Sequence, residues 1–149
     1  MHVLSGRRGA DVSYEEKGTW VYLLVSLIVY AGYVITVLGR AQTPISTTAY
    51  QWPLVIAIGL AVVTSVALRV LVEIVRPSET HRADARDRDI DRIGIIRSWW
   101  LVTAGAVAAL AMALAEWPHF WIANVVYLGF VLQAVTGSAV KLGAYRRGL

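Results

Sequence analysis

The sequence contains no cysteine. Without a thiol, the chain cannot form disulfides, thiolate metal sites, iron–sulfur clusters or a cysteine nucleophile. The sequence also lacks the phosphate-binding pattern G-x-x-x-x-G-K-[ST], the nucleophile pattern G-x-S-x-G and the zinc-binding pattern H-E-x-x-H. No polar stretch is long enough to fold as a separate catalytic domain. We therefore expect a protein that is not an enzyme.

Histidine is scarce, and no charge lies near the middle of any long apolar run. His2 and His81 fall outside these runs, so His119 alone cannot supply the two axial ligands of a buried haem. A proton-driven antiporter normally needs an ionisable group that changes protonation within the membrane, and no run has a charged residue near its middle to serve as one. We expect no cofactor.

Long apolar runs are what the sequence has in abundance. The chain is 57% hydrophobic, which is more apolar surface than a soluble fold of 149 residues can hide. Each run is close to the roughly 20 residues that cross a bilayer core of about 30 Å. The runs cover residues 19–39, 52–75, 98–115 and 120–140. We predict an all-α polytopic membrane protein, a bundle of four transmembrane helices forming one membrane domain over residues 1–149.

Two details bear on how these helices pair. The connection around Pro118 is too short for anything but an antiparallel hairpin. Lys17-x-x-Trp20 before the first run is echoed by Arg97-x-x-Trp100 before the third, as two tandem helical hairpins would require. Chance similarity between apolar helices with charged flanks explains the echo equally well.

Basic residues are distributed very unevenly. Three of the 14 Lys and Arg precede the first run, seven lie from Arg69, near the end of the second run, to Arg97, just before the third, and three follow the fourth. Only Arg40 falls in a segment on the opposite side. By the positive-inside rule, both termini, the segment 1–17 and the charged segment 76–97 are cytoplasmic in a multi-pass protein of the cell membrane. Acidic residues in the first 17 and the lack of a cleavage site argue against a cleaved signal peptide.

The charged segment 76–97 is the most unusual part of the chain. Its carboxylates allow a divalent-cation site, but the interleaved signs are more typical of a solvated helix that extends the third span inward. Because most basic residues flank apolar runs, we expect the partners to be anionic lipid headgroups or another membrane protein, and no nucleic acid. The candidate interaction residues are Asp84, Arg86, Asp87, Arg88, Asp91 and Arg92.

Polar side chains form a stripe along the fourth run. Polar groups in lipid need partners, so the stripe must face protein or water. It can join helices through hydrogen bonds or line a path for a solute, and the absence of a deeply buried acid that could couple protons favours joining helices. The stripe consists of Asn124, Tyr127, Gln133, Thr136 and Lys141.

Glu116 and His119 form a candidate interfacial site at the outer surface. His119 has the chemistry to titrate near neutral pH or to join Glu116 in a metal site. Its aromatic neighbours favour a simpler role as part of an interfacial belt.

Small residues recur along the third run. Rows of this kind let helix backbones approach closely in lipid. We expect the protein to self-associate through such faces on the third and fourth spans, with a dimer favoured. The two rows are Ala104, Ala108 and Ala111, and Gly105, Ala109 and Ala113.

Four stretches of the chain carry a resemblance: S-Y-E-E-K-G-T-W at 13–20, D-x-R-D-x-x-I at 84–90, H-F-W-I-A-N at 119–124 and residues 141–148. They resemble a family of small four-helix bacterial membrane proteins of unknown function. The resemblance covers nearly the whole chain from Ser13, and the motifs at 84–90 and 119–124 are its most specific elements. The resemblance implies a four-helix membrane fold and supplies no activity.

Taken together, these features favour a non-enzymatic accessory or regulatory subunit that acts through the charged segment 76–97. The alternative is a small oligomeric transporter or channel with a polar path along the fourth span.

Overall fold

The computed structural model describes residues 14–75 and 85–147, with side chains from Glu16 and from Arg88 onward in the two ranges. Within these ranges, four helices are long and apolar enough to cross a membrane. The prediction of an all-α fold with four spanning helices is therefore confirmed. The elements are α1 (Tyr14–Gly39), the short 3-10 helix η1 (Ile45–Thr47), α2 (Gln51–Val75), α3 (Ala85–Leu114) and α4 (His119–Arg147).

The helices are longer than the apolar runs. Residues 85–97, which we predicted to belong to a charged connection, are the first turns of α3. This agrees with the interpretation of the charged segment as a helix that extends the third span. Likewise, α4 continues past the run that ends at residue 140 as far as Arg147.

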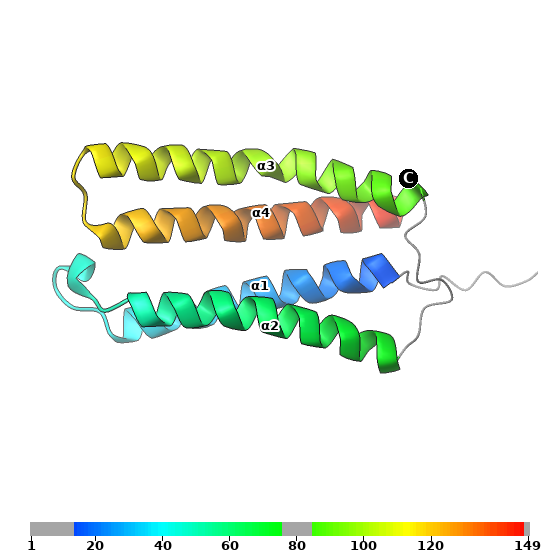
Figure 1. Cartoon of the computed structure of the whole chain (residues 1–149), viewed down its shortest axis with the longest axis horizontal. Helices are drawn as coiled ribbons and strands as arrows, with labels where there is room; N and C mark the ends of the chain where they lie inside the picture. Colours follow the sequence, from blue (N-terminus) through cyan, green and yellow to red (C-terminus); the bar gives the residue numbers. More distant parts are fainter. Residues whose placement is uncertain (1–13, 76–84, 148–149) are drawn as a thin grey trace, which may run out of the picture.

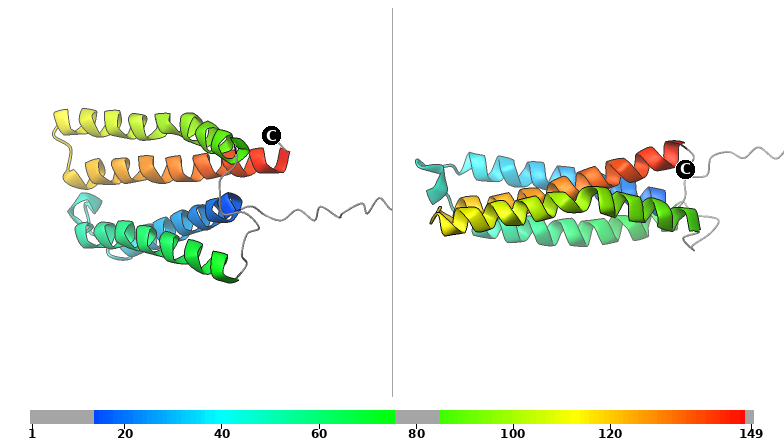
Figure 2. Two further views of the ribbon diagram at one scale, coloured as in Figure 1. Left: turned by 45° about the vertical axis from the view of Figure 1, so that its right-hand side comes forward. Right: turned by 90° about the horizontal axis from the view of Figure 1, so that it is seen from above.

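The helices pair as two consecutive hairpins, α1 with α2 and α3 with α4, and α1 also packs against α4 (Figure 1). The tandem-hairpin arrangement is thus present. The further views in Figure 2 show the same pairing, with the ends of α2 and α4 and the starts of α1 and α3 at one end of the bundle. This end, which we call the basic end, carries Arg69, Lys141 and Arg146.

A tight turn closes the α3–α4 hairpin. The backbone N–H of Trp117 donates to the carbonyl of Met112 at 2.9 Å, and that of Glu116 donates to the carbonyl of Ala113 at 3.1 Å. This pair of bonds is the Schellman arrangement that ends many helices. Glu116 has a φ of 55°, in the left-handed region that glycine usually occupies at this position. The predicted antiparallel connection is therefore confirmed.

Close backbone contact holds α3 to α4. A Cβ atom added at Gly105 would lie 3.2 Å from the Cα of Gly129, and one added at Gly137 would lie 3.0 Å from the Oγ of Ser98. Only glycine leaves room for this approach, which gains packing between helices that lipid cannot supply through the hydrophobic effect.

The buried apolar core lies toward the end of the bundle opposite the basic end. Tyr33 of α1 and Tyr127 of α4 pack edge to face with ring centroids 5.2 Å apart. Tyr50 and Phe120 pack in the same way at 5.3 Å. These aromatic pairs join α1 and the start of α2 to α4. In α2, which the structure describes in full, Ala57 is the one buried residue.

Candidate functional site

The polar stripe predicted on α4 divides among three environments. Asn124 faces α1, where its Oδ1 accepts a hydrogen bond from the hydroxyl of Tyr33 at 2.8 Å. Its Nδ2 donates to the carbonyl of Phe120 in its own helix at 2.8 Å. Both ends of the amide are therefore satisfied, and Asn124 joins the two hairpins.

Gln133 faces α3 instead. Its Nε2 donates to the Oγ of Ser98 at 3.4 Å. Ser98 is completely buried, and its hydroxyl donates to the carbonyl of Gly94 at 2.8 Å. These bonds place polar groups inside the α3–α4 contact, as the helix-joining interpretation predicts. Thr136 is half-buried on α4 and does not line the cavity described next.

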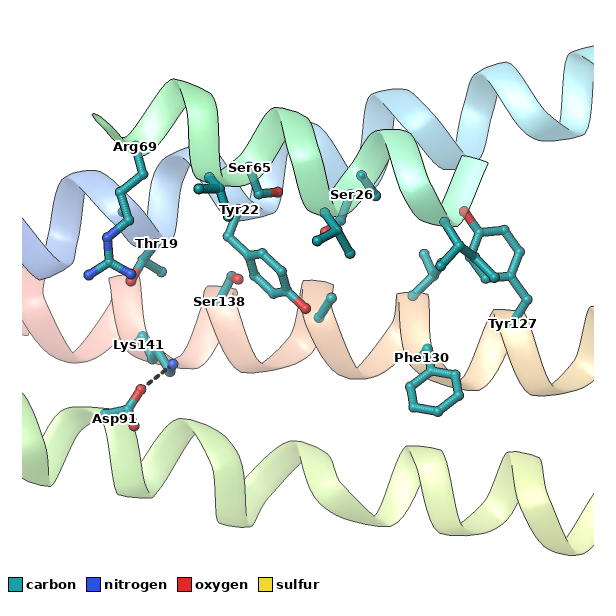
Figure 3. A pocket seen from close by; sticks show the side chains of 17 residues that line it. Thr19, Tyr22, Ser26, Ser65, Arg69, Asp91, Tyr127, Phe130, Ser138 and Lys141 are labelled. Atoms are coloured by element: carbon teal, nitrogen blue, oxygen red, sulfur yellow. Dashed lines mark hydrogen bonds and ion pairs between the residues drawn. The ribbon is translucent and has the colours of Figure 1, made fainter. Parts of the chain in front are cut away.

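A cavity of about 650 Å³ lies between α1, α2 and α4 (Figure 3). Of the predicted stripe, only Tyr127 and Lys141 line it. Hydroxyl groups from three helices line it from the basic end, where Thr19 lies beside Arg69, to its middle, and Tyr127 and Phe130 lie at the far end among apolar side chains (Figure 3). The hydroxyl residues are Thr19, Tyr22, Ser26, Ser65 and Ser138, and the apolar ones include Ile58, Val62, Phe130 and Val131.

Charged side chains line the cavity at the basic end. The ammonium group of Lys141 forms an ion pair with the Oδ1 of Asp91, the residue through which α3 reaches the cavity. Arg69 extends from α2 over α1, where a Cβ added at Gly18 would lie 3.1 Å from the Nε and Cζ atoms of the guanidinium. Figure 3 shows Arg69 and Lys141 at the same end of the cavity.

A third basic residue at this end also crosses between helices. The Cζ of Arg146 lies 5.8 Å from the ring centroid of Trp20, within the range of a cation–π contact. The end of α4 is thus bound to the start of α1. At this level, Arg69, Lys141 and Arg146 each contact a neighbouring helix.

The predicted interaction residues of the charged segment are only partly described. Arg88, Asp91 and Arg92 are exposed on the first turns of α3. Asp84 lies outside the described residues, and of Arg86 and Asp87 only the helical backbone is described. Ile90 is buried, so this part of the helix has one face against the bundle and another toward solvent.

Glu116 and His119 are both exposed on either side of the outer turn. Among the described residues, no three His, Asp or Glu side chains come together as a metal ion would require. Glu116 and His119 therefore have no third candidate metal ligand beside them in the described part of the chain.

The small-residue rows of α3 fall on two sides of the helix. Gly105 and Ala109 are buried, and Gly105 packs against α4 of the same chain. Ala104, Ala108 and Ala111 line an outward-facing groove with Trp99 and Trp100. The dimer stays a prediction, and the row available to it is the one in this groove.

Sequence reasoning missed the cavity. Arg69, near the end of the second apolar run, lies over Gly18 and lines this cavity. A usable signal was present, because Ser65 and Arg69 lie four residues apart on one face of an otherwise apolar helix. The matching face of α1, with Gly18, Tyr22 and Ser26, has the same spacing.

Comparison of this chain with known protein families, with curated proteins and with solved structures found no match.

Proposed function

We propose that this protein is a non-enzymatic accessory or regulatory subunit in the membrane, which acts through the charged first turns of α3, residues 85–97. The observation that carries the proposal is that α3 continues without a break from these turns into its apolar span. A change in the position of the charged turns is therefore passed directly to the spanning helix.

The length of α3 supports an aqueous docking surface. Thirteen helical residues, from 85 to 97, extend roughly 20 Å at a rise of about 1.5 Å per residue. The headgroup layer adds only about 5–8 Å on each side of the hydrocarbon core. The first turns of α3 therefore extend beyond the headgroups, where a partner protein can reach them. The excess of basic residues in this segment favours the cytoplasmic side.

The charge pattern supports a polar partner surface. Arg88, Asp89 and Arg92 are exposed with alternating sign, so a partner needs a matching arrangement of charges. The ion pair between Asp91 and Lys141 holds these turns beside α4. The docking surface is thus oriented by the bundle before a partner binds.

Photocrosslinking in intact cells tests this proposal. A photoreactive amino acid at Arg92 should capture a defined partner protein, whereas the same probe at the lipid-facing Val107 should not. The double charge reversal Arg88→Glu and Arg92→Glu should abolish association with that partner in native lipid. Arg147→Glu, at the exposed end of α4, serves as the matched control and should leave it intact. A protein that purifies from native lipid as a monomer with no partner contradicts the proposal.

The competing proposal is a small transporter or channel, and the 650 Å³ cavity is the observation that favours it. The apolar core around Tyr33, Tyr127 and Phe120 closes the bundle at the far end, so transport requires that core to open. If proteoliposomes that contain the protein transport no ion and no cationic drug, the result argues against this function. Flux that persists unchanged in a Gln133→Leu variant removes the predicted path along α4.

A further inference from the structure

We propose that the cavity between α1, α2 and α4 binds one uncharged lipid, a diacylglycerol, whose oxygens form hydrogen bonds with hydroxyl groups of the cavity wall. One acyl chain of this lipid fills the apolar part of the cavity. The inference is independent of the accessory role assigned to the charged turns of α3. It rests on a buried hydroxyl group without a hydrogen bond, on the volume of the cavity and on the open side of the bundle.

Ser138 on α4 is a buried residue whose hydroxyl group lacks a partner. Among the described residues, the buried Ser and Thr side chains are Thr48, Ser98 and Ser138. Thr48 accepts a hydrogen bond from the backbone N–H of Gln42 at 3.1 Å, and Ser98 donates one to the carbonyl of Gly94 at 2.8 Å. Ser138 is 3% exposed and lines the cavity, and it forms no hydrogen bond in the described part of the chain. Because a buried polar group without a partner is costly, and more so in lipid, Ser138 favours a ligand that can bond to it.

Three further hydroxyl groups line the cavity from the facing helices. Tyr22 and Ser26 of α1 and Ser65 of α2 form no hydrogen bond within the ranges that the structure describes. Figure 3 shows the hydroxyl groups of Ser138 and Tyr22 in the space between α4 and the α1–α2 hairpin. A hydroxyl group both donates and accepts, so this wall can bind the hydroxyl and ester oxygens of a lipid.

The charged side chains at the basic end do not require a charged ligand. The ammonium group of Lys141 is paired with Asp91, and Arg69 has an interaction of its own. An ion in the cavity would have to take one of these partners away or stay unpaired in surroundings of low polarity. An uncharged ligand can bind the hydroxyl groups while the ion pair stays in place.

The hydroxyl groups lie slightly deeper in the bilayer than the charged groups. Ser65 precedes Arg69 by four residues and Ser138 precedes Lys141 by three, which is about 4.5–6 Å along each helix. Ser138 lies 19 residues after the start of α4, or roughly 29 Å from the outer end of this helix. With a hydrocarbon core of about 30 Å, Ser138 is at the boundary where the acyl chains of a glycerolipid join its glycerol unit.

The volume of the cavity favours an amphiphile over water alone. Filling about 650 Å³ would take roughly twenty water molecules at about 30 Å³ each. Each ordered water needs about two to four polar partners, which the apolar part of the wall does not supply. A hydrocarbon chain fits this part, and the whole volume is within the ordinary range of about 300–1,000 Å³ for ligand sites. The apolar lining residues are Ile58, Val62, Val66, Phe130 and Val131.

The open side of the bundle gives a lipid access from the membrane. Among the described residues, α2 packs extensively against α1 alone, while α3 and α4 pack against each other. The cavity therefore has an incomplete wall between α2 and α4. In a bilayer this side faces lipid, so a diacylglycerol can enter laterally and keep its second acyl chain in the bilayer.

Photolabelling of the full chain in phosphatidylcholine nanodiscs tests the proposal. The probe is a diacylglycerol with a photoreactive group in one acyl chain, and mass spectrometry of peptides locates the label. We expect the label at the buried cavity residues Val131 and Ala134. Unlabelled diacylglycerol should compete with the probe, whereas phosphatidylglycerol and hexadecane at the same concentration should not.

Two matched pairs of variants on α4 separate the cavity from its surroundings. Ser138→Ala and Thr136→Val each remove one hydroxyl group, and only Ser138 lines the cavity. Ser138→Ala should weaken binding of the probe roughly threefold to tenfold, the equivalent of one hydrogen bond, and Thr136→Val should leave it unchanged. Ala134→Leu places a larger side chain in the cavity and should abolish labelling. Ala139→Leu, at an exposed position outside the cavity wall, should not.

Unfolding of the lipid-free protein in detergent separates ligand binding from a structural role of the same hydroxyl group. Ser138→Ala removes no hydrogen bond of the described chain, so it should not lower the unfolding midpoint. Ser98→Ala removes the bonds to Gly94 and Gln133 and should lower it. Added diacylglycerol should raise the midpoint of the unaltered protein more than that of Ser138→Ala.

Four results would overturn the proposal. Competition by hexadecane as strong as that by diacylglycerol means that the site does not bind the oxygens. Equal competition by phosphatidylglycerol means that the site is not selective for an uncharged lipid. A lower unfolding midpoint of Ser138→Ala means that its hydroxyl group is bonded within the chain. Absence of label from Val131 and Ala134 means that no diacylglycerol enters the cavity. Ser138→Ala answers the question even where Ala134→Leu does not fold.

Discussion

The α1–α2 and α3–α4 hairpins are built from helices of similar length, and each contains several glycines, yet the glycines serve different purposes. Gly105, Gly129 and Gly137 meet the backbone or a short side chain of the facing helix. Gly32 and Gly59 have nothing within 4 Å of an added Cβ. In lipid, where apolar contact alone does not drive association, only the first kind brings two backbones together. The α3–α4 hairpin is therefore closely packed, whereas α2 contacts the bundle mainly along α1.

The largest expected effect separates the two kinds of glycine. We expect Gly105→Ala to lower the free energy of unfolding by about 1–3 kcal/mol, the usual cost of overpacking a tight contact. The new methyl group would lie 3.2 Å from the Cα of Gly129 and 3.3 Å from the carbonyl of Val125, and neither is the mobile end of a side chain. Detergent unfolding followed by circular dichroism measures the change.

The matched control for this substitution is Gly59→Ala in α2. Its added methyl group meets open space, and alanine is the better helix former by about 1 kcal/mol. We expect no loss of stability or a small gain. Equal destabilisation of both variants would contradict the distinction between the two hairpins.

The second prediction concerns the turn that closes the tighter hairpin. Glu116→Gly should raise the free energy of unfolding by about 1 kcal/mol, because glycine accepts a φ of 55° without the steric cost that a Cβ brings. The same detergent titration measures it. Glu116→Ala keeps the Cβ and removes the carboxylate, so a gain as large in this variant would assign the effect to charge instead of backbone.

The third prediction addresses the contact between the hairpins. Tyr33→Phe removes the hydrogen bond to Asn124 and should cost about 0.6 kcal/mol, a typical value for such a bond between membrane helices. Tyr30→Phe is the control, since Tyr30 packs against Tyr127 through its ring with centroids 5.6 Å apart. If the two variants lose the same stability, the bond to Asn124 does not contribute specifically.

The smallest expected effect is that of the ion pair between Lys141 and Asp91. The side chain of Asp91 is 56% exposed, so water weakens the attraction. A double-mutant cycle with Lys141→Met and Asp91→Asn should give a coupling energy of at most about 0.5 kcal/mol. Added salt should reduce this coupling further. A coupling that is large and independent of salt would show that the pair is more enclosed than its exposure indicates.

The sequence predicted the four helices well because the length and hydropathy of each run are properties of that run alone. It also predicted that α3 approaches another helix closely, from the spacing of Gly105 and Ala109. It could not show which helix packs against α3, because the pattern of small residues is the same for contact with α4 of the same chain and for contact with another copy. The choice is made by Gly129, which lies against Gly105, and by Gly137, which lies against Ser98 and Gly94.

The cavity was harder to predict for a related reason. Its wall combines Gly18 of α1 with Arg69 of α2, two residues 51 positions apart whose contact depends on how the helices are packed. Asn124 and Gln133 looked alike on one helix, but they bond to opposite neighbours. A difference of nine positions turns a side chain on a helix by two and a half turns, which is enough to change the helix that it faces.

The uneven packing of α2 has a consequence in the plane of the membrane. The helices α1, α3 and α4 are held by direct contacts, so the area that they occupy among the lipids is set by the protein. The remaining helix, α2, packs mainly against α1. The area between α2 and the α3–α4 hairpin therefore depends on which molecules fill it. The cross-section of this protein is therefore fixed on one side and responsive to lateral pressure on the other.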